Sequence, residues 1–400
     1  MALDKVTTKV IADDAVTGAK IENNPTVAGN LTVAGTSTLT GNATASGNLT
    51  VTGDIVPSAP LSHRNIVING AMTIAQRGIS STSTGGSGYY HTADRMFNFD
   101  NCVAANFTRE STNGVLGTES DNTFKDVFPY SWKFASNGTV SSIPASDRVF
   151  FAYKIEGQDV QHLAKGTASA KPITLSFWVK STQTGNHQVN ITDDNSRMIG
   201  AVYAISSANT WEKKIITFPG DTTGGTIDND NTQGLAIEWW LTAGSTYTSG
   251  AVPTSWEANA AGDRAAGAVA NYVGGSGRTW QITGIQLELG SNATPYEHRS
   301  YGDELARCQR YYTEHDAGSY VLAYLNPIKG STGASDEYRR YMFYYPVRMR
   351  ANPTVTATGD PGSISINNPA NKEYAHCAGD QGGDEGTVVN LRTVKADAEL

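Results

Sequence analysis

The stretch GLAIEWWLTAG, residues 234–244, places an apolar side chain at every second position. The residues in phase are Leu235, Ile237, Trp239 and Leu241. A period of two is that of a β-strand with one face turned to a core. The stretches RVFFAYKIEG, residues 148–157, and PITLSFWVKST, residues 172–182, show the same period. These three stretches therefore predict half-buried antiparallel strands.

A fourth stretch, TWQITGIQLELG at residues 279–290, has the same alternation with one interruption. Trp280 and Ile282 are in phase, and the apolar positions then shift by one residue at Gly284. Such a shift is typical of a β-bulge. Loops such as STQTGN and FPGDTTGG join the expected strands. The sequence therefore predicts an all-β fold in which a jelly roll or β-sandwich occupies residues 64–299.

The composition excludes several classes of protein. The 400 residues carry a net charge of −8 and no basic run, which argues against nucleic acid as a partner. No stretch is long and apolar enough for membrane insertion, and no classical export signal precedes the first strands. Three cysteines far apart in sequence imply neither a disulfide framework nor a metal site. We expect no cofactor.

Residues 29–53, GNLTVAGTSTLTGNATASGNLTVTG, have a glycine at every sixth position. Each hexad alternates small apolar residues with Thr or Ser, so it predicts a short strand that cannot bury its face alone. A shaft of three identical chains would bury that face, and its expected interface residues are Leu31, Val33, Leu39, Leu49 and Val51. The alternative is a flexible linker.

Residues 300–313 contain the one helix that the sequence predicts with a clear start. Ser300 and Asp303 form a capping box, and the spacing puts Leu305, Cys308 and Tyr312 on one face. Two interpretations stay open. The helix packs on its own domain, or three copies form a collar in which these residues contact the other chains.

The remaining residues return to strand patterns and predict a second, smaller β domain. Six parts of the chain are expected: an N-terminal attachment segment 1–26, a shaft 27–56, a linker 57–63, a jelly roll 64–299, a helix or collar 300–313, and a C-terminal β domain 314–400.

Aromatic residues are the strongest candidates for a binding surface. Strand alternation directs Trp239 to the core and its neighbour Trp240 to the opposite face, beside Glu238. An exposed ring next to a hydrogen-bonding group is how proteins commonly hold sugars. The other candidate residues lie in or near loops and edges: Tyr89, Tyr90, Tyr247, Trp256 and Tyr272.

The sequence lacks the common catalytic motifs GxSxG, GxxxxGK[ST], GxGxxG and HExxH. Glycoside cleavage needs only two carboxylates, and three sets of side chains are candidates: Asp193 with Asp194, Asp228 with Asp230, and Glu238 beside the tryptophans. Loop aspartates more often cap turns, and we predict no catalytic residue. In TIDNDNTQG, Asp228 and Asp230 are weak candidates for a structural calcium site.

Four segments resemble a large group of bacteriophage tail fibre proteins. They are RNIVINGAMTIAQRG (64–78), YHTADRMF (90–97), ITGIQLELGSNATPYEHRSYGDELARCQRYY (282–312) and YPVRMRANPTV (345–355). The resemblance implies a homotrimeric fibre with a sandwich similar to carbohydrate-binding modules. Its N-terminus would contact other phage tail proteins, and its C-terminal part would face the host.

The resemblance also implies a function. Such a fibre is a virion protein, made in the host cytoplasm, that binds a bacterial surface glycan or outer-membrane receptor. The alternatives are a tailspike-like polysaccharide depolymerase and a purely structural tail component. No receptor-binding residue carries over, because no motif fixes those residues in the family. The shared segments look like scaffold, so we expect specificity to lie in loops.

Overall fold

The computed structural model describes residues 63–400 apart from 84–86, 91, 103–104, 112–127, 269–270, 317–321, 326, 329–336, 339, 361–362, 368–370 and 381–388. All of the described residues belong to one compact unit, Pro57–Leu400. The expected attachment segment and hexad shaft, with Leu31, Val33, Leu39, Leu49 and Val51, lie outside the described residues.

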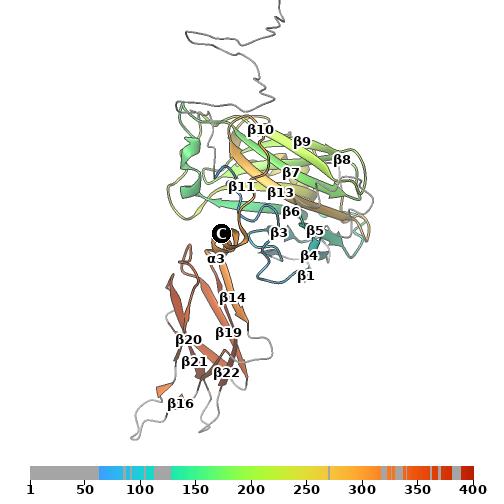
Figure 1. Ribbon diagram of the computed structural model, residues 1–400. Helices are drawn as coiled ribbons and strands as arrows, with labels where there is room; N and C mark the ends of the chain where they lie inside the picture. The colour runs from blue at the N-terminus through green and yellow to red at the C-terminus, as the bar shows by residue number, and fades with distance from the viewer. Residues whose placement is uncertain are drawn as a thin grey trace, which may run out of the picture. The chain divides into compact units, whose positions relative to one another are not determined.

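Two antiparallel sheets form the sandwich predicted for this part of the chain (Figure 1). The six-stranded sheet has the order β1 (Ser80–Ser83), β4 (Ala105–Ser111), β5 (Tyr130–Ser136), β13 (Thr279–Leu289), β7 (Ile173–Ser181), β10 (Glu212–Phe218). The seven-stranded sheet has the order β12 (Glu257–Ala258), β9 (Arg197–Ile205), β8 (Gly185–Asp193), β11 (Gln233–Ala243), β6 (Arg148–Glu156), β3 (Phe97–Asp100), β2 (Ser87–Tyr90). Both sheets contribute to one core.

The alternating residues of β6, β7 and β11 all point into this core, as the sequence predicted. Trp239 of β11 lies 5.6 Å from Phe177 of β7, ring centre to ring centre, and so joins the two sheets. Trp132 of β5 packs similarly on Phe151 of β6, at 4.6 Å. Burying rings of this size supplies much of the apolar area on which a sandwich depends.

The predicted bulge at Gly284 is confirmed. The pairing of β13 with β7 shifts register between Thr283 and Gln286, and Gly284 has a positive φ of 61°. A Cβ atom at Gly284 would lie 2.7 Å from the ring of Phe128, so a larger residue would displace that ring. The bulge thus makes room for Phe128, which is 3% exposed.

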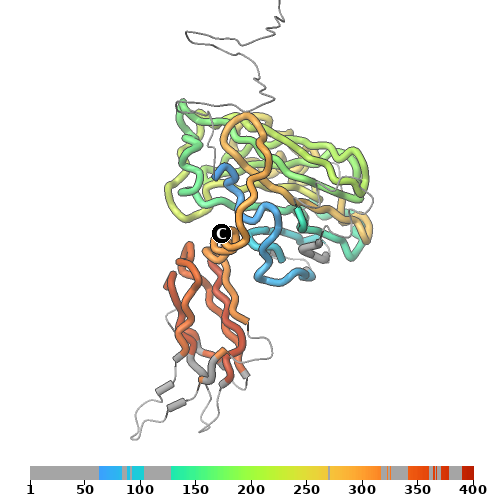
Figure 2. Tube along the Cα trace, in the orientation of Figure 1, coloured from blue at the N-terminus to red at the C-terminus, as the bar shows by residue number. Residues whose placement is uncertain are grey.

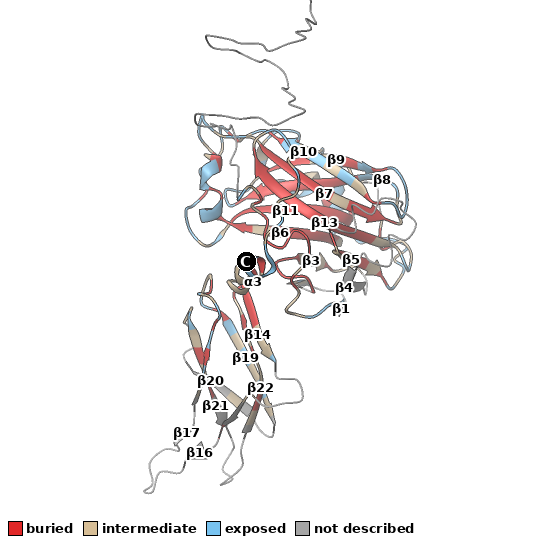
Figure 3. Ribbon diagram, viewed as in Figure 1, coloured by how far each residue is buried: buried red, intermediate tan, exposed pale blue. Residues whose placement is uncertain are grey.

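The prediction that these strands are half-buried is wrong, because β6 and β7 are also buried on both faces over most of their length. The longest of the three is β11. Its second face is covered as well, and Figure 3 colours the strand as buried over most of its length. The cover consists of the short helix α2 (Ser245–Thr248) and the chain that follows it. Polar residues of β8 bind this cover: Gln188 donates to the Asp263 carbonyl and Asn190 to the Arg264 carbonyl, each at 2.7 Å.

Helix α3 (Tyr301–Gln309) begins as predicted, since the Ser300 hydroxyl accepts a hydrogen bond from the Asp303 backbone N–H. It ends four residues earlier than expected. Tyr312 opens strand β14 (Tyr312–Asp316), which pairs with β22 (Val389–Asp397).

Of the two interpretations of α3, the structure shows the helix packed on its own chain. Cys308 is fully buried in the sandwich core, and Leu305 packs half-buried against it. Tyr312 is 4% exposed. The assignment of Cys308 and Tyr312 to a trimer interface is therefore wrong, because their own chain already covers both side chains.

The strands after α3 form smaller antiparallel sheets around a separate apolar cluster. One sheet joins β14, β22, β15 (Ala323–Leu325) and β19 (Thr354–Asp360); a second has the order β18 (Arg340–Tyr344), β21 (Tyr374–Asp380), β20 (Ser363–Asn367); a third pairs β16 (Pro327–Ile328) with β17 (Glu337–Tyr338). The sequence predicted strand patterns for this part of the chain, and the described residues after α3 do form strands.

A buried arginine connects these sheets with the sandwich. Arg95 is 1% exposed, forms an ion pair with Glu399, and lies 3.5 Å above the ring of Tyr311. Arg77 pairs with Glu399 at 3.2 Å and with Asp397 at 3.1 Å. Since an unpaired buried charge is costly, these contacts fix the end of β22 against the sandwich.

One buried histidine makes the stability of the fold depend on pH. His187 of β8 accepts or donates one hydrogen bond with the Tyr272 hydroxyl at 2.7 Å. Burial lowers the pKa of His187 to about 4, although a hydrogen bond with the Gly185 carbonyl acts in the opposite direction. The imidazole is therefore neutral in the folded protein at pH 5, whereas it is protonated in the unfolded chain.

We predict that acid destabilises the wild type more than the variant His187→Gln. Between pH 6.5 and about 4 the unfolded chain binds a proton that the folded chain does not, so the free energy of unfolding falls as pH falls, by up to about 3 kcal/mol. Urea unfolding at pH 7 and pH 4.5 measures this. The difference in free energy of unfolding between the wild type and the variant should be smaller at pH 4.5 than at pH 7. The same pH dependence in both proteins would contradict a neutral, buried His187.

Candidate functional site

A cavity of about 310 Å³ opens beside the start of α3. Its walls come from four parts of the chain: the segment after His63, the residue before β5, the first turn of α3, and the segment between β13 and α3. Figure 2 shows the first and last of these running beside each other, in blue and orange. The lining residues are Asn69, Ala71, Thr73, Pro129, Tyr296, His298, Arg299, Tyr301 and Glu304.

Aromatic rings form one side of the cavity. Tyr296 and His298 meet edge to face, with ring centres 4.8 Å apart. Behind them, Phe128 contacts Tyr296 at 4.9 Å and His298 at 5.8 Å. Tyr301, on the first turn of α3, is 62% exposed. The site thus combines two supported rings with a third that projects into solvent.

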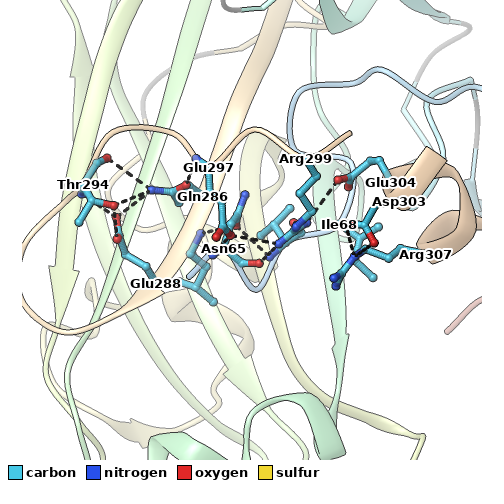
Figure 4. Close-up of polar contacts among 12 residues, drawn as sticks. Asn65, Ile68, Gln286, Glu288, Thr294, Glu297, Arg299, Asp303, Glu304 and Arg307 are labelled. Atoms are coloured by element: carbon cyan, nitrogen blue, oxygen red, sulfur yellow. Dashed lines mark hydrogen bonds and ion pairs between the residues drawn. The ribbon is translucent and has the colours of Figure 1, made fainter. Parts of the chain in front are cut away.

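Charged and polar groups form the other side. Arg299 and Glu304 form an ion pair with Nη1 and Oε2 3.4 Å apart. Glu304 also accepts a hydrogen bond from the backbone N–H of Asn69. Arg299 donates to the backbone carbonyls of Val67 and Asn65, so its guanidinium is held in one position. Figure 4 shows Arg299 between Asn65 and Glu304.

A second group of hydrogen bonds fixes the segment that carries Tyr296 and His298. Thr294 donates from its hydroxyl to Glu288 at 2.7 Å, and the Glu297 N–H donates to Gln286 at 2.8 Å (Figure 4). The Glu297 carboxylate accepts from the Asn65 N–H at 2.9 Å. Burial opposes ionisation of Glu297, but this and neighbouring backbone N–H donors lower its pKa overall. The cavity is therefore formed in advance by the fold.

The chemistry of these residues suits a ligand that is apolar on one face and rich in hydroxyl groups at its edge. Tyr301 and His298 offer rings to the apolar face. Arg299 and Glu304 offer a donor and an acceptor to the hydroxyls. Burial lowers the pKa of His298, so its imidazole is neutral at pH 7 and can either donate or accept.

The expectation that Trp240 stands exposed is wrong. The structure does bring Trp240, Glu238 and Tyr247 together, but on the covered face of β11. Trp240 is fully buried between Phe150, at 5.1 Å, and Tyr247, at 5.3 Å, and its indole N–H donates to Glu238 at 3.1 Å. Burial raises the pKa of Glu238. These side chains pack the second layer and are not accessible to a glycan.

The other aromatic candidates lie apart from one another. Tyr272 is fully buried, and its hydroxyl bonds to Ser181 at 2.5 Å. Trp256 is half-buried and donates its indole N–H to the Pro219 carbonyl. On the edge strand β2, Tyr90 contacts Phe97 at 5.4 Å, while Tyr89 is 49% exposed. The predicted residues therefore do not form one surface.

The acidic candidates are engaged in structural contacts. Asp193 forms a buried ion pair with Lys165. Asp194 accepts from the Asp228 N–H at 3.1 Å, and Asp230 accepts from Thr232, as in an Asx-turn. Among the described residues, no group of three or more His, Cys, Asp or Glu side chains is placed to hold a metal ion. The described helices include none that is long and apolar enough to cross a membrane.

The residues of the cavity were missed because they fell in a segment that we interpreted as scaffold. The sequence TPYEHRSYGDE, residues 294–304, carries Tyr296, His298, Arg299, Tyr301 and Glu304 within nine positions. Three aromatic or imidazole rings next to two opposite charges form a dense group for a chain with 17% charged residues. This density of rings and charges is the sequence signal that could have identified the cavity residues.

The sequence matches no protein-family model and no curated protein. Solved structures similar to the chain include the enzymatically active domain of tailspike protein 4 of bacteriophage CBA120, at 13% identity and a TM-score of 0.29, over 56% of this chain and 21% of that chain. Another is a family 11 carbohydrate-binding module from Clostridium thermocellum in complex with a β-1,3-1,4-mixed-linked tetrasaccharide, at 12% identity and a TM-score of 0.25. That similarity covers 55% of this chain and 99% of the module.

We predict opposite outcomes for two aromatic truncations. Trp240→Ala should lower the free energy of unfolding by about 3–5 kcal/mol, because it leaves a cavity between Phe150 and Tyr247. Tyr301→Ala should change it by less than about 1 kcal/mol, since the ring is mostly in solvent. Urea unfolding of both variants measures this. A Trp240 variant as stable as the wild type would contradict the burial assigned to that face.

Proposed function

We propose that this chain is a bacteriophage tail fibre protein that attaches the virion to its host by binding a bacterial surface glycan in the cavity beside α3. The observation that carries the proposal is the cavity itself. It presents Tyr301 and His298 next to a fixed pair of Arg299 and Glu304. The resemblance of four sequence segments to tail fibre proteins supports the biological setting.

A sugar fits this arrangement better than a purely apolar ligand. A pyranose ring has a C–H face that packs on an aromatic ring and hydroxyls that need donors and acceptors. The volume of about 310 Å³ is at the lower end for small-ligand sites, which suits one or two sugar units. A site of this size binds weakly, and attachment then depends on several copies acting together.

Binding without cleavage is the activity that this lining favours. Glycoside hydrolysis by the usual routes needs two carboxyl groups on either side of the scissile bond. Glu304 is the one carboxylate among the residues that line the cavity, so this lining lacks the second carboxyl group that those routes need. We therefore propose a binding protein and not a depolymerase.

The first test measures binding of the full chain to purified lipopolysaccharides and capsular polysaccharides immobilised on a sensor. We expect Tyr301→Ala to weaken binding of the matching oligosaccharide about tenfold, as the ring contact contributes about 1–2 kcal/mol. Tyr344→Ala is the matched control, because Tyr344 is 64% exposed and lies on β18, outside the cavity.

Equal binding by the Tyr301 variant and the wild type would overturn the site. Release of reducing ends from the bound polysaccharide would favour the depolymerase instead. If the full chain binds none of the polysaccharides, the purely structural tail component becomes the better interpretation.

The fibre is proposed to be a homotrimer whose residues 29–53 form the shared shaft and whose residues 1–26 contact other tail proteins. Light scattering of the purified full chain should give three times the 42.5 kDa mass of one chain. Replacing Leu49 and Val51 by Asp should lower that mass, because a charge on a shared apolar face is costly. A single-chain mass for the wild type would contradict the fibre.

A further inference from the structure

A second cavity, of about 330 Å³, has a strongly cationic lining. Four of its lining residues carry a positive charge and one a negative charge: Arg310, Arg348, Arg350, Lys372 and Asp230. The chain as a whole carries a net charge of −8, so this lining opposes the overall sign. These five charged residues come from four separate segments of the chain. The fold brings the segments together beside the C-terminal end of α3.

Hydrogen bonds hold the walls of this basic cavity in place. Three backbone bonds of 2.8 Å join the segments in pairs: Gln158 to Asp230, Met349 to Lys372, and Arg350 to Arg310. The Asn231 side chain also donates to the Arg350 carbonyl at 2.6 Å. The fold therefore places the segments that carry the cations next to one another before a ligand binds. This preorganisation lowers the entropic cost of binding.

Two of the arginines have structural partners and still retain donors. Arg310 binds the buried Glu156 through Nε and Nη2, at 3.2 and 2.8 Å. Its Nη1 group makes no hydrogen bond with a described residue. Arg350 donates to backbone carbonyls, among them those of Ala398 at 2.7 Å and Glu399 at 3.0 Å. Carbonyl oxygens bind its N–H groups without cancelling its charge.

The other two cations are accessible and weakly compensated. Arg348 has a side chain that is 72% exposed, and its Nε lies 4.0 Å from the Glu373 carboxylate, too far for a hydrogen bond. Lys372 is half-buried and forms no ion pair within the part of the chain that the structure describes. These side chains offer a guanidinium fork and an ammonium group to an incoming anion.

Three carboxylates oppose the cations and limit the strength of the site. Glu156 is balanced by Arg310, and Glu373 is 66% exposed at the rim. Asp230 faces the cavity, and hydrogen bonds from Thr232 lower its pKa, so it is ionised at pH 7. The cations in the lining still outnumber the carboxylates, which favours a small anion held by several donors at once.

We propose that the basic cavity binds an anionic group, a carboxylate or a phosphate. The carboxylate of an acidic sugar and a phosphate substituent share this chemistry, since each presents planar or tetrahedral oxygens to Arg and Lys donors. This inference does not rest on the proposed function of the cavity beside α3, because different residues line the two cavities. The basic cavity is thus proposed as a second binding site, which selects ligands that carry a negative charge.

The test is calorimetric titration of the full chain at low ionic strength with sodium glucuronate, with inorganic phosphate, and with glucose as the uncharged control. We expect saturable binding of at least one anion and none of glucose. Added salt should weaken it, because exposed charges are screened. Glucuronate binding alone identifies an acidic sugar as the source, and phosphate binding alone identifies a phosphate group.

Variants with opposite expected effects keep the test independent of misfolding. The double variant Arg348→Gln, Lys372→Gln should weaken anion binding by about tenfold or more. Asp230→Asn should strengthen it by about two- to fivefold, since the amide oxygen retains the acceptor for Thr232 and the opposing charge is removed. Arg307→Gln is the control, because Arg307 pairs with Asp303 on α3, outside the cavity.

Saturable binding that the double variant retains in full, or that glucose reproduces, would overturn the proposal, as would the absence of binding by both anions. Tyr301→Ala should leave anion binding unchanged. A loss of glycan binding in that variant together with intact anion binding would separate the two sites, so failure of one proposal is distinguishable from failure of the other.

Discussion

The buried side chain of Arg299 is the constraint on which the rest of the site depends. Its side chain is 8% exposed, so its charge must be satisfied within the protein. Two backbone carbonyls of the segment after His63 and the carboxylates of Glu297 and Glu304 do this. One guanidinium thereby ties the first described segment, the loop after β13 and the first turn of α3 to one another. The contacts of Arg299 therefore hold these three segments on the sandwich and also determine the shape of the cavity.

Helix α3 connects the two cavities. Tyr301 and Glu304, on its first turn, line the cavity with the aromatic side, and Arg310, just after its last residue, lines the basic cavity. Nine helical residues span about 13 Å, so the two sites lie at opposite ends of a short rigid element. Cys308, near the end of α3, is buried in the sandwich core. Packing of the helix on the sandwich therefore fixes the positions of both sites.

The sequence predicted the inner faces of the strands well, because alternation alone assigns Leu235, Ile237 and Trp239 to one side. It also located the bulge at Gly284. The prediction that Trp240 is exposed failed. A period of two assigns side chains to the two faces of a strand, but it does not show whether a later segment of the chain covers the outer face. Tyr247, only seven residues away, supplies that cover. Likewise, the pairing of Arg299 with the carbonyls of Asn65 and Val67 spans more than 230 positions, and no local pattern encodes it.

The most direct measurement is an experimental structure of the full chain bound to an oligosaccharide fragment of the polysaccharide that it recognises. The proposed glycan site requires a sugar ring packed on Tyr301 and His298, with its hydroxyls at Arg299 and Glu304. A fragment bound elsewhere, for example beside Tyr89 at the edge of the seven-stranded sheet, would contradict it. So would a cavity filled by side chains of a second copy of the chain.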